Sequence, residues 1–90
     1  MDNLVILYTM KGCPFCDMMK EQLVEENIEY YERDIDEHDE EHKLFVEVTG
    51  SDYVPAFMIV DTVTEDAKLF APDRDFQDIN EAVGIIKNIL

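Results

Sequence analysis

The sequence has few glycines, prolines and cysteines. Its 90 residues include three glycines, three prolines and two cysteines, so the chain is neither collagen-like nor of low complexity. Hydrophobic residues make up 47% of the chain, which is enough for a modest buried core. Because domains usually have about 100 to 200 residues, we expect one domain that spans residues 1–90.

Basic residues are also scarce, with seven against 22 acidic residues and a formal net charge of −15. Phosphate groups and anionic lipids repel such a protein, so the charge argues against nucleic acid and membrane partners. The longest apolar run, residues 4–8, is far too short to span a bilayer, and no signal peptide is evident. We therefore expect a soluble protein of a reducing compartment, the cytoplasm.

The first half of the chain has the pattern of a strand, a helix and a second strand. Residues 4–8 suit a central strand that is buried on both faces. Pro14 fits the first turn of a helix that ends near Asn27, because its missing N–H needs no partner there. The second strand is expected to begin with Ile28 and Tyr30. Such a βαβ unit normally joins two parallel strands.

The second half adds a helix, a hairpin and a last helix. After the acidic residues 36–41, an apolar stripe predicts a helix that stops at Gly50. Two short strands, residues 56–60 and 68–70, are joined by a polar turn, which indicates an antiparallel hairpin. The stripe of the second helix consists of Leu44, Phe45, Val46 and Val48.

The last helix is expected to begin after Pro72, with Asp75 as its N-cap. Gly84 inside this helix costs about 1 kcal/mol relative to Ala, which indicates a close backbone contact. The apolar face of the helix is predicted to contain Phe76, Ile79, Ala82, Val83, Ile86 and Leu90. The expected order of elements is therefore β-α-β-α-β-β-α.

The two cysteines lie three positions apart, where the first strand passes into the first helix. A thiolate is the reactive form of cysteine, and a helix N-terminus stabilises it. Cys13, at the N-cap edge, is therefore the predicted nucleophile. Cys16, one turn later, can attack a mixed disulfide formed on Cys13 and release the reduced substrate. Lys11 is the nearest cation and is expected to favour the thiolate further.

Two other interpretations of the cysteines are weaker. Buried, inert cysteines need neither a strand-to-helix junction nor a proline between them. A zinc site could combine them with His38 and His42, but 21 residues separate Cys16 from His38, against about 12 to 15 in a zinc finger. The histidines lie in an acidic run, which favours a solvated helix face. No metal site is therefore expected.

Tyr53-Val54-Pro55 stands directly before the third predicted strand. Since proline cannot donate a hydrogen bond to a sheet, Pro55 marks either a strand start or a cis turn. Together with the Cys13-Pro14-Phe15-Cys16 segment and Gly50, this motif resembles a dithiol glutaredoxin, and the resemblance extends over nearly the whole chain.

The resemblance implies an α/β, thioredoxin-like fold, with a four-stranded mixed sheet flanked by three helices. It implies a cis Val54–Pro55 bond facing the cysteines, and a Val54 backbone that pairs with a bound peptide or glutathione. Phe15 and Tyr53 stand where the family usually has Tyr and Thr, and are expected to line the substrate site. Glutathione is the implied co-substrate, and no tightly bound cofactor is expected.

Several positions depart from the family pattern. Met10 stands where a lysine is common, and Ser51 and Asp52 stand where basic residues are common. The family's Gly-Gly-x-Asp segment, which receives a carboxylate of glutathione, corresponds here to Ala71-Pro72-Asp73 or a neighbouring variant. The remaining candidates to bind the carboxylates are Lys11, Arg74 and the N-terminus of the last helix near Asp75. We therefore expect glutathione to react, but with weakened affinity.

Residues 25–42 carry ten acids and one base, a net charge of −9. This segment is either a solvated face or a surface that steers a basic partner protein toward the cysteines. The sequence thus predicts a disulfide reductase acting on proteins or glutathione mixed disulfides. One alternative is a thioredoxin-like protein disulfide reductase recycled by a flavoprotein reductase, although Leu7 stands where that family has a buried acid. The other alternative is a non-enzymatic metal-binding or interaction module.

Overall fold

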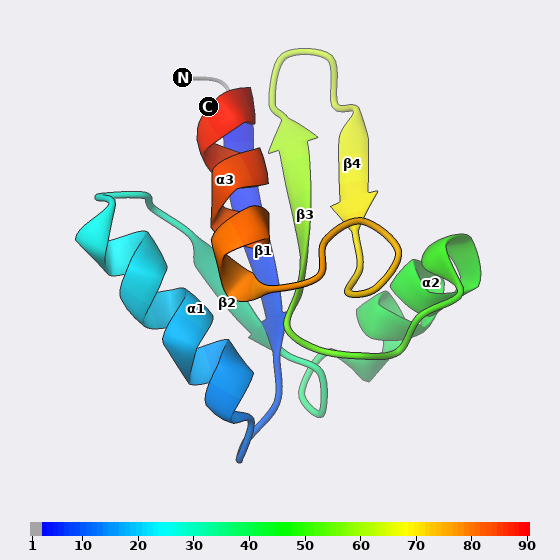
Figure 1. Cartoon of the computed structure of the whole chain (residues 1–90). Coiled ribbons are helices and arrows are strands. Elements are labelled where there is room, and N and C mark those ends of the chain that lie inside the picture. The colour runs from blue at the N-terminus through cyan, green and yellow to red at the C-terminus, as the bar shows by residue number, and fades with distance from the viewer. Residues whose placement is uncertain (1–2) are drawn as a thin grey trace.

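A mixed four-stranded sheet forms the centre of the protein (Figure 1). The structure is a computed structural model that describes residues 3–90. The strand order is β2-β1-β3-β4. β1 (Asn3–Thr9) is parallel to β2 (Tyr31–Asp34) and antiparallel to β3 (Ala56–Asp61). β3 and β4 (Ala67–Phe70) form an antiparallel hairpin. The α/β, thioredoxin-like architecture and the element order expected from the sequence are confirmed.

Three helices cover the two faces of this sheet. α1 (Pro14–Glu25) and α3 (Ile79–Ile89) pack on one face, and α2 (Asp39–Thr49) packs on the other (Figure 1). Alternate residues of β1 supply both cores, because successive side chains of a strand point to opposite faces. Val5 and Leu7 belong to the core under α1 and α3, whereas Tyr8 belongs to the core under α2.

The apolar run of β1 is buried on both faces except at its start. Val5, Leu7 and Tyr8 are fully buried, but Leu4 is 38% exposed. Leu4 lies on the same face of β1 as Ile6 and Tyr8, the face that α2 covers. The core on that face includes Ile6 and Tyr8 but does not reach Leu4. The prediction that this run is buried is therefore confirmed for Val5, Leu7 and Tyr8, whereas Ile6 is partly buried and Leu4 is exposed.

The second strand begins later than predicted. β2 starts at Tyr31, which pairs with Ile6, while Ile28 and Tyr30 precede the strand and pack on the core. The delay follows from the end of α1, where Asn27 takes a left-handed backbone (φ 58°) and the Ile28 N–H bonds to the Leu23 carbonyl at 2.9 Å. These residues are therefore used in ending the helix and reversing the chain.

The last helix also begins later than predicted, at Ile79, and its N-cap is Asp78 rather than Asp75. The Asp78 carboxylate accepts the Glu81 N–H at 2.9 Å. The Asp75 carboxylate instead accepts the Ala71 N–H at 2.8 Å and closes a loop before the helix. Phe76 belongs to this loop, and its side chain is buried in the core. Leu90 is the C-cap residue and is half-exposed, so neither residue lies within the helix itself.

Two smaller expectations for the helices were wrong. Leu44 and Val48 of α2 are 64% and 72% exposed, because only the side of α2 that carries Phe45 faces the sheet. A Cβ atom added to Gly84 would meet nothing within 4 Å, so no close backbone contact explains this glycine. Gly50 does end α2, in a left-handed conformation (φ 75°) with its N–H bonded to the Val46 carbonyl. No helix within residues 3–90 is long and apolar enough to cross a membrane.

Candidate active site

Cys13 is the N-cap residue of α1, and it is joined to Cys16 by a disulfide. Gly12, with a left-handed φ of 76°, turns the chain from β1 into the helix, and Pro14 occupies the first turn. The Cys16 N–H donates a hydrogen bond to the Cys13 sulfur, with 3.1 Å between N and Sγ. The first residue of the pair therefore lies at the positive end of the helix dipole, as expected.

The two sulfurs differ in accessibility. Cys13 is 8% exposed, whereas Cys16 is 1% exposed and packs inside the first turn of α1. An incoming thiolate or disulfide can therefore reach Cys13 first. The same N–H and helix terminus that contact the Cys13 sulfur in the disulfide would stabilise a negative charge on that sulfur after reduction.

Val54 and Pro55 lie against the cysteine pair. Their peptide bond is cis, as the resemblance implies, and the Cys13 Sγ is 4.0 Å from the Val54 carbonyl oxygen. Pro55 is buried directly before β3. Tyr53, the residue before Val54, is 63% exposed. The structure thus brings the second motif of the sequence to the first, although 41 residues separate Cys13 from Val54.

Lys11 and Phe15 flank the cysteines on the surface. Lys11 is exposed in the turn that precedes Cys13. The described part of the chain has no carboxylate within 4 Å of its ammonium group. Phe15 is 60% exposed between the two cysteines. Both residues are therefore available to a molecule that approaches Cys13.

Residues 71–78 use their polar groups within the loop before α3. The Arg74 Nε pairs with the Asp75 carboxylate at 3.2 Å. Asp73 has a left-handed backbone (φ 68°), and its N–H bonds to the Phe76 carbonyl. The Gln77 N–H bonds to the Glu81 carboxylate, at 2.7 Å. Arg74 and the start of α3, both candidates for a glutathione carboxylate, are thus already engaged with acidic side chains.

A polar network that the sequence analysis missed lies under the other face of β1. The Tyr8 hydroxyl donates to the Glu41 carboxylate at 2.6 Å, and Glu41 also pairs with Arg33 at 3.3 Å. Burial raises the pKa of the Tyr8 hydroxyl well above its usual value, and the hydrogen bond and charge of Glu41 raise it further. Glu41 lies in a continuous acidic run, so nothing local in the sequence distinguishes it.

His42 is part of the same surroundings, which corrects the expectation of a solvated helix face. It is only 9% exposed and stacks on Phe45, with 6.3 Å between ring centroids. Its Nε2 has no hydrogen-bond partner among the described residues. Within residues 3–90, no three His, Cys, Asp or Glu side chains form a group that could hold a metal ion.

A second network joins α1 to the edge of the sheet. The Glu32 carboxylate accepts the hydroxyl hydrogen of buried Thr9 at 2.8 Å and the Lys20 ammonium at 3.0 Å. The Thr9 hydrogen bond, followed by that from Lys20, lowers the pKa of the Glu32 carboxyl below its usual value. This contact ties the helix that carries the cysteines to β2.

A groove lies between α1 and the start of α3, and we call it the α1/α3 groove. It reaches Val54, which contacts the Cys13 sulfur. It has a volume of about 340 Å³. Its walls are formed by Phe15, Met18, Gln22, Val54, Pro55, Pro72 and residues 76–80. Phe15, which is expected to line the substrate site, and Met18 are 60% and 45% exposed and border this groove. The other residues of the groove wall come from segments far along the chain, so the spacing of residues along the helix could not reveal the groove.

The chain is similar to known proteins in both sequence and structure. The glutaredoxin family model matches residues 5–63, a span that includes both cysteines and Val54–Pro55. No curated protein matches the chain. A solved structure described as "Structure of a malarial protein" has a TM-score of 0.56 and 16% identity, covering 100% of this chain and 99% of that one, which supports the fold. The match over well more than half of the chain, together with the cysteine pair, places this protein in the glutaredoxin family.

Proposed function

We propose that this protein reduces disulfides of proteins, or mixed disulfides of glutathione, through Cys13 and Cys16. The observation that carries the proposal is the disulfide between these cysteines at the N-terminus of α1. The pair is already in its oxidised form there, and Cys13 is its more exposed member. Thiol–disulfide oxidoreductase activity follows from family membership, whereas the substrate and the electron donor are part of the proposal.

The reaction transfers two electrons from the reduced cysteine pair. The Cys13 thiolate attacks one sulfur of the substrate disulfide, the substrate S–S bond breaks, and the first substrate thiol leaves with a proton from solvent. Cys16 then loses its proton and attacks the Cys13 sulfur. This second attack forms the Cys13–Cys16 disulfide and releases the second substrate thiol. One substrate disulfide is reduced while one protein disulfide is formed.

We further propose that glutathione serves as an electron donor with weakened affinity. A charge-assisted hydrogen bond to a carboxylate contributes about 1.5 to 3 kcal/mol, so each lost cation weakens binding roughly tenfold or more. Arg74 is paired with Asp75, and exposed Met10 and Asp52 lie where the family usually has basic residues. Lys11 is the cation best placed to replace them. The same shortage of cations supports the alternative of a thioredoxin-like protein recycled by a flavoprotein reductase.

A coupled assay with hydroxyethyl disulfide tests the proposal. The wild-type protein is supplied either with glutathione and glutathione reductase or with thioredoxin reductase, and NADPH consumption is followed. We expect turnover with glutathione, with a KM for glutathione above that of a family member that keeps the basic residues. We expect Cys13→Ser to lose at least 99% of the turnover. Cys16→Ser is the matched control, because it keeps the attacking thiolate and loses only the intramolecular second step. An inactive wild-type protein that copurifies with zinc would instead favour a metal-binding module.

A further inference from the structure

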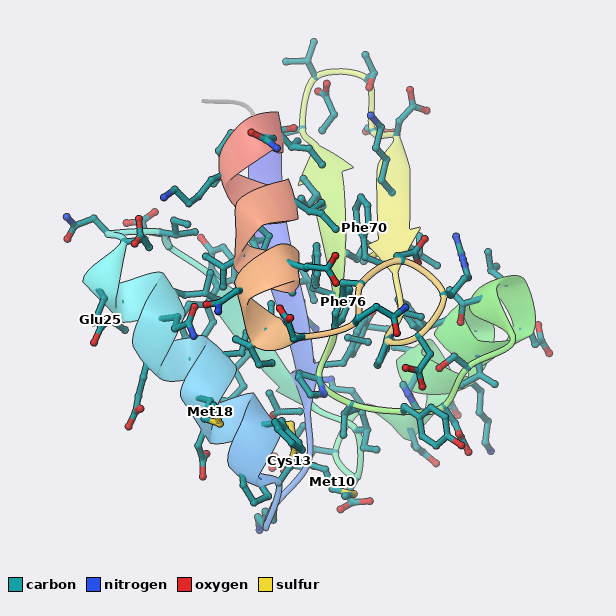
Figure 2. All side chains as sticks on the ribbon, viewed as in Figure 1. Met10, Cys13, Met18, Glu25, Phe70 and Phe76 are labelled. Atoms are coloured by element: carbon teal, nitrogen blue, oxygen red, sulfur yellow. A yellow bond between two sulfur atoms is a disulfide. The ribbon has the colours of Figure 1, made fainter. Side chains whose placement is uncertain are left out.

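The α1/α3 groove has the character of a binding site for an apolar group. Phe15 and Met18 border it from α1, and Pro55, Phe76 and Ile79 are buried at its base. Figure 2 labels Cys13 and Met18 toward the N-terminal end of α1, and Phe76 beside the start of α3. Large apolar side chains that remain exposed around a hollow commonly mark a place where a partner binds.

We propose that the α1/α3 groove receives one bulky apolar side chain of an extended protein substrate, from a residue near the cysteine that Cys13 attacks, with a basic residue close by. This inference rests on the proposed disulfide reductase function and specifies its substrate class. It makes the groove a specificity site, separate from the two sulfurs that carry out the chemistry.

The groove is large enough for one bulky side chain. Its volume of about 340 Å³ is at the small end of the 300 to 1,000 Å³ typical of ligand pockets. Its position fits as well, because Val54 both lines the groove and contacts the Cys13 sulfur at 4.0 Å. Since an extended chain advances about 3.3 Å per residue, a side chain one or two residues from the attacked cysteine can reach the groove.

The charge around the groove favours a basic segment. The two stretches that form most of its walls, residues 13–22 and 72–81, contain six acidic and two basic residues, a net charge of −4. Both basic residues are already paired, Lys20 with Asp17 and Glu32, and Arg74 with Asp75. An anionic ligand such as glutathione finds no unpaired cation in these stretches. A lysine or arginine beside the apolar anchor instead meets the net negative charge of the two stretches, with Asp78 in the groove wall itself.

The amide side chains at the rim suit a polypeptide. Gln22, Gln77 and Asn80 line the groove and can donate to and accept from a peptide backbone. Gln77 already bonds through its Nε2 to the Asp73 carbonyl, at 3.3 Å, which leaves its oxygen as an acceptor. Apolar walls for one side chain, amides for the backbone and acids for a neighbouring cation together describe a short basic-apolar segment.

The test measures single-turnover reduction of synthetic nine-residue peptides. Each peptide carries one cysteine as a mixed disulfide with 2-mercaptoethanol, in an alanine background, and leucine is scanned over the two positions on either side. A neighbouring lysine is compared with glutamate. With reduced wild-type protein, we expect at least one leucine position to raise the rate constant about tenfold, which corresponds to about 1.4 kcal/mol. We expect lysine to raise it further relative to glutamate.

A matched pair of variants locates the preference. Met18→Gln changes an exposed side chain in the groove, and Val24→Gln changes a 65% exposed side chain on the same helix outside it. Neither variant alters the net charge, and glutamine is a good helix former. We expect the leucine-to-alanine rate ratio to fall at least threefold in Met18→Gln and to stay unchanged in Val24→Gln. The ratio within each variant cancels any change in the reactivity of Cys13.

Two results would overturn the inference. One is a wild-type protein that reduces hydroxyethyl disulfide but shows no leucine preference at any position, which would leave the proposed function standing. The other is a preference that Met18→Gln and Val24→Gln reduce equally. Failure of the wild-type protein to reduce hydroxyethyl disulfide would instead reject the proposed function, so the two failures are distinguishable.

Discussion

At the scale of single residues, Cys13 and Cys16 have different surroundings. The Cys13 sulfur accepts the Cys16 N–H at the end of α1, and Cys16 is buried at 1% exposure. In the reduced protein we therefore expect Cys13 to form its thiolate at a pH below the value of about 8.5 for a free thiol, and Cys16 not to do so. The rate of alkylation by iodoacetamide against pH in Cys16→Ser and Cys13→Ser measures this difference, and equal pH midpoints would contradict it.

The positions of the two cysteines were predictable from the sequence because local signals fix them. A continuous apolar run, a glycine and a proline determine where β1 ends and α1 begins, and the N-cap follows from that junction. The contact between Tyr8 and Glu41 depends instead on which side of α2 meets the sheet. Tertiary packing decides that orientation, so the acidic run in the sequence could not indicate which carboxylate is bonded.

At the scale of elements, the start of α3 depends on one carboxylate. Asp78 accepts the Glu81 N–H, and this cap is the reason the helix begins after the loop of residues 71–78. We expect Asp78→Ala to lower the free energy of unfolding by about 1 kcal/mol, the usual cost of losing an aspartate N-cap. Urea denaturation measures the change. The control is Asp36→Ala, which removes the same charge from an exposed turn and should change stability by less than about 0.5 kcal/mol.

Most elements could be predicted because their patterns are long or have clear ends. β1, α1 and the β3–β4 hairpin match the expected positions closely. The starts of β2 and α3 could not be predicted, because in both places an apolar residue of the preceding loop packs on the core. These residues are Ile28 before β2 and Phe76 before α3. Burial alone does not separate a helix or strand residue from a loop residue that packs on the same core.

At the scale of the whole molecule, negative charge dominates the surface. Of the seven basic side chains, four are paired with carboxylates, namely Lys20, Arg33, Arg74 and Lys87. The paired side chains are partly exposed to solvent, which weakens each pair, so each contributes little to stability, but together the pairs reduce the positive charge available to a ligand. The net charge of −15 therefore acts on any charged disulfide that approaches Cys13, over a distance of about 10 Å at 0.1 M salt.

This field predicts opposite effects of salt on disulfides of opposite charge. The dication cystamine should react with the reduced protein faster as ionic strength falls, because attraction concentrates it near the acidic surface. A dianionic disulfide, dithiodiglycolate, should react more slowly as ionic strength falls, and neutral hydroxyethyl disulfide should be nearly insensitive. Comparing the three slopes of log rate against ionic strength removes the differences in intrinsic reactivity. Three equal slopes would contradict the prediction, because they would show that Lys11 and the helix N-terminus cancel the field of the surrounding carboxylates at the cysteine pair.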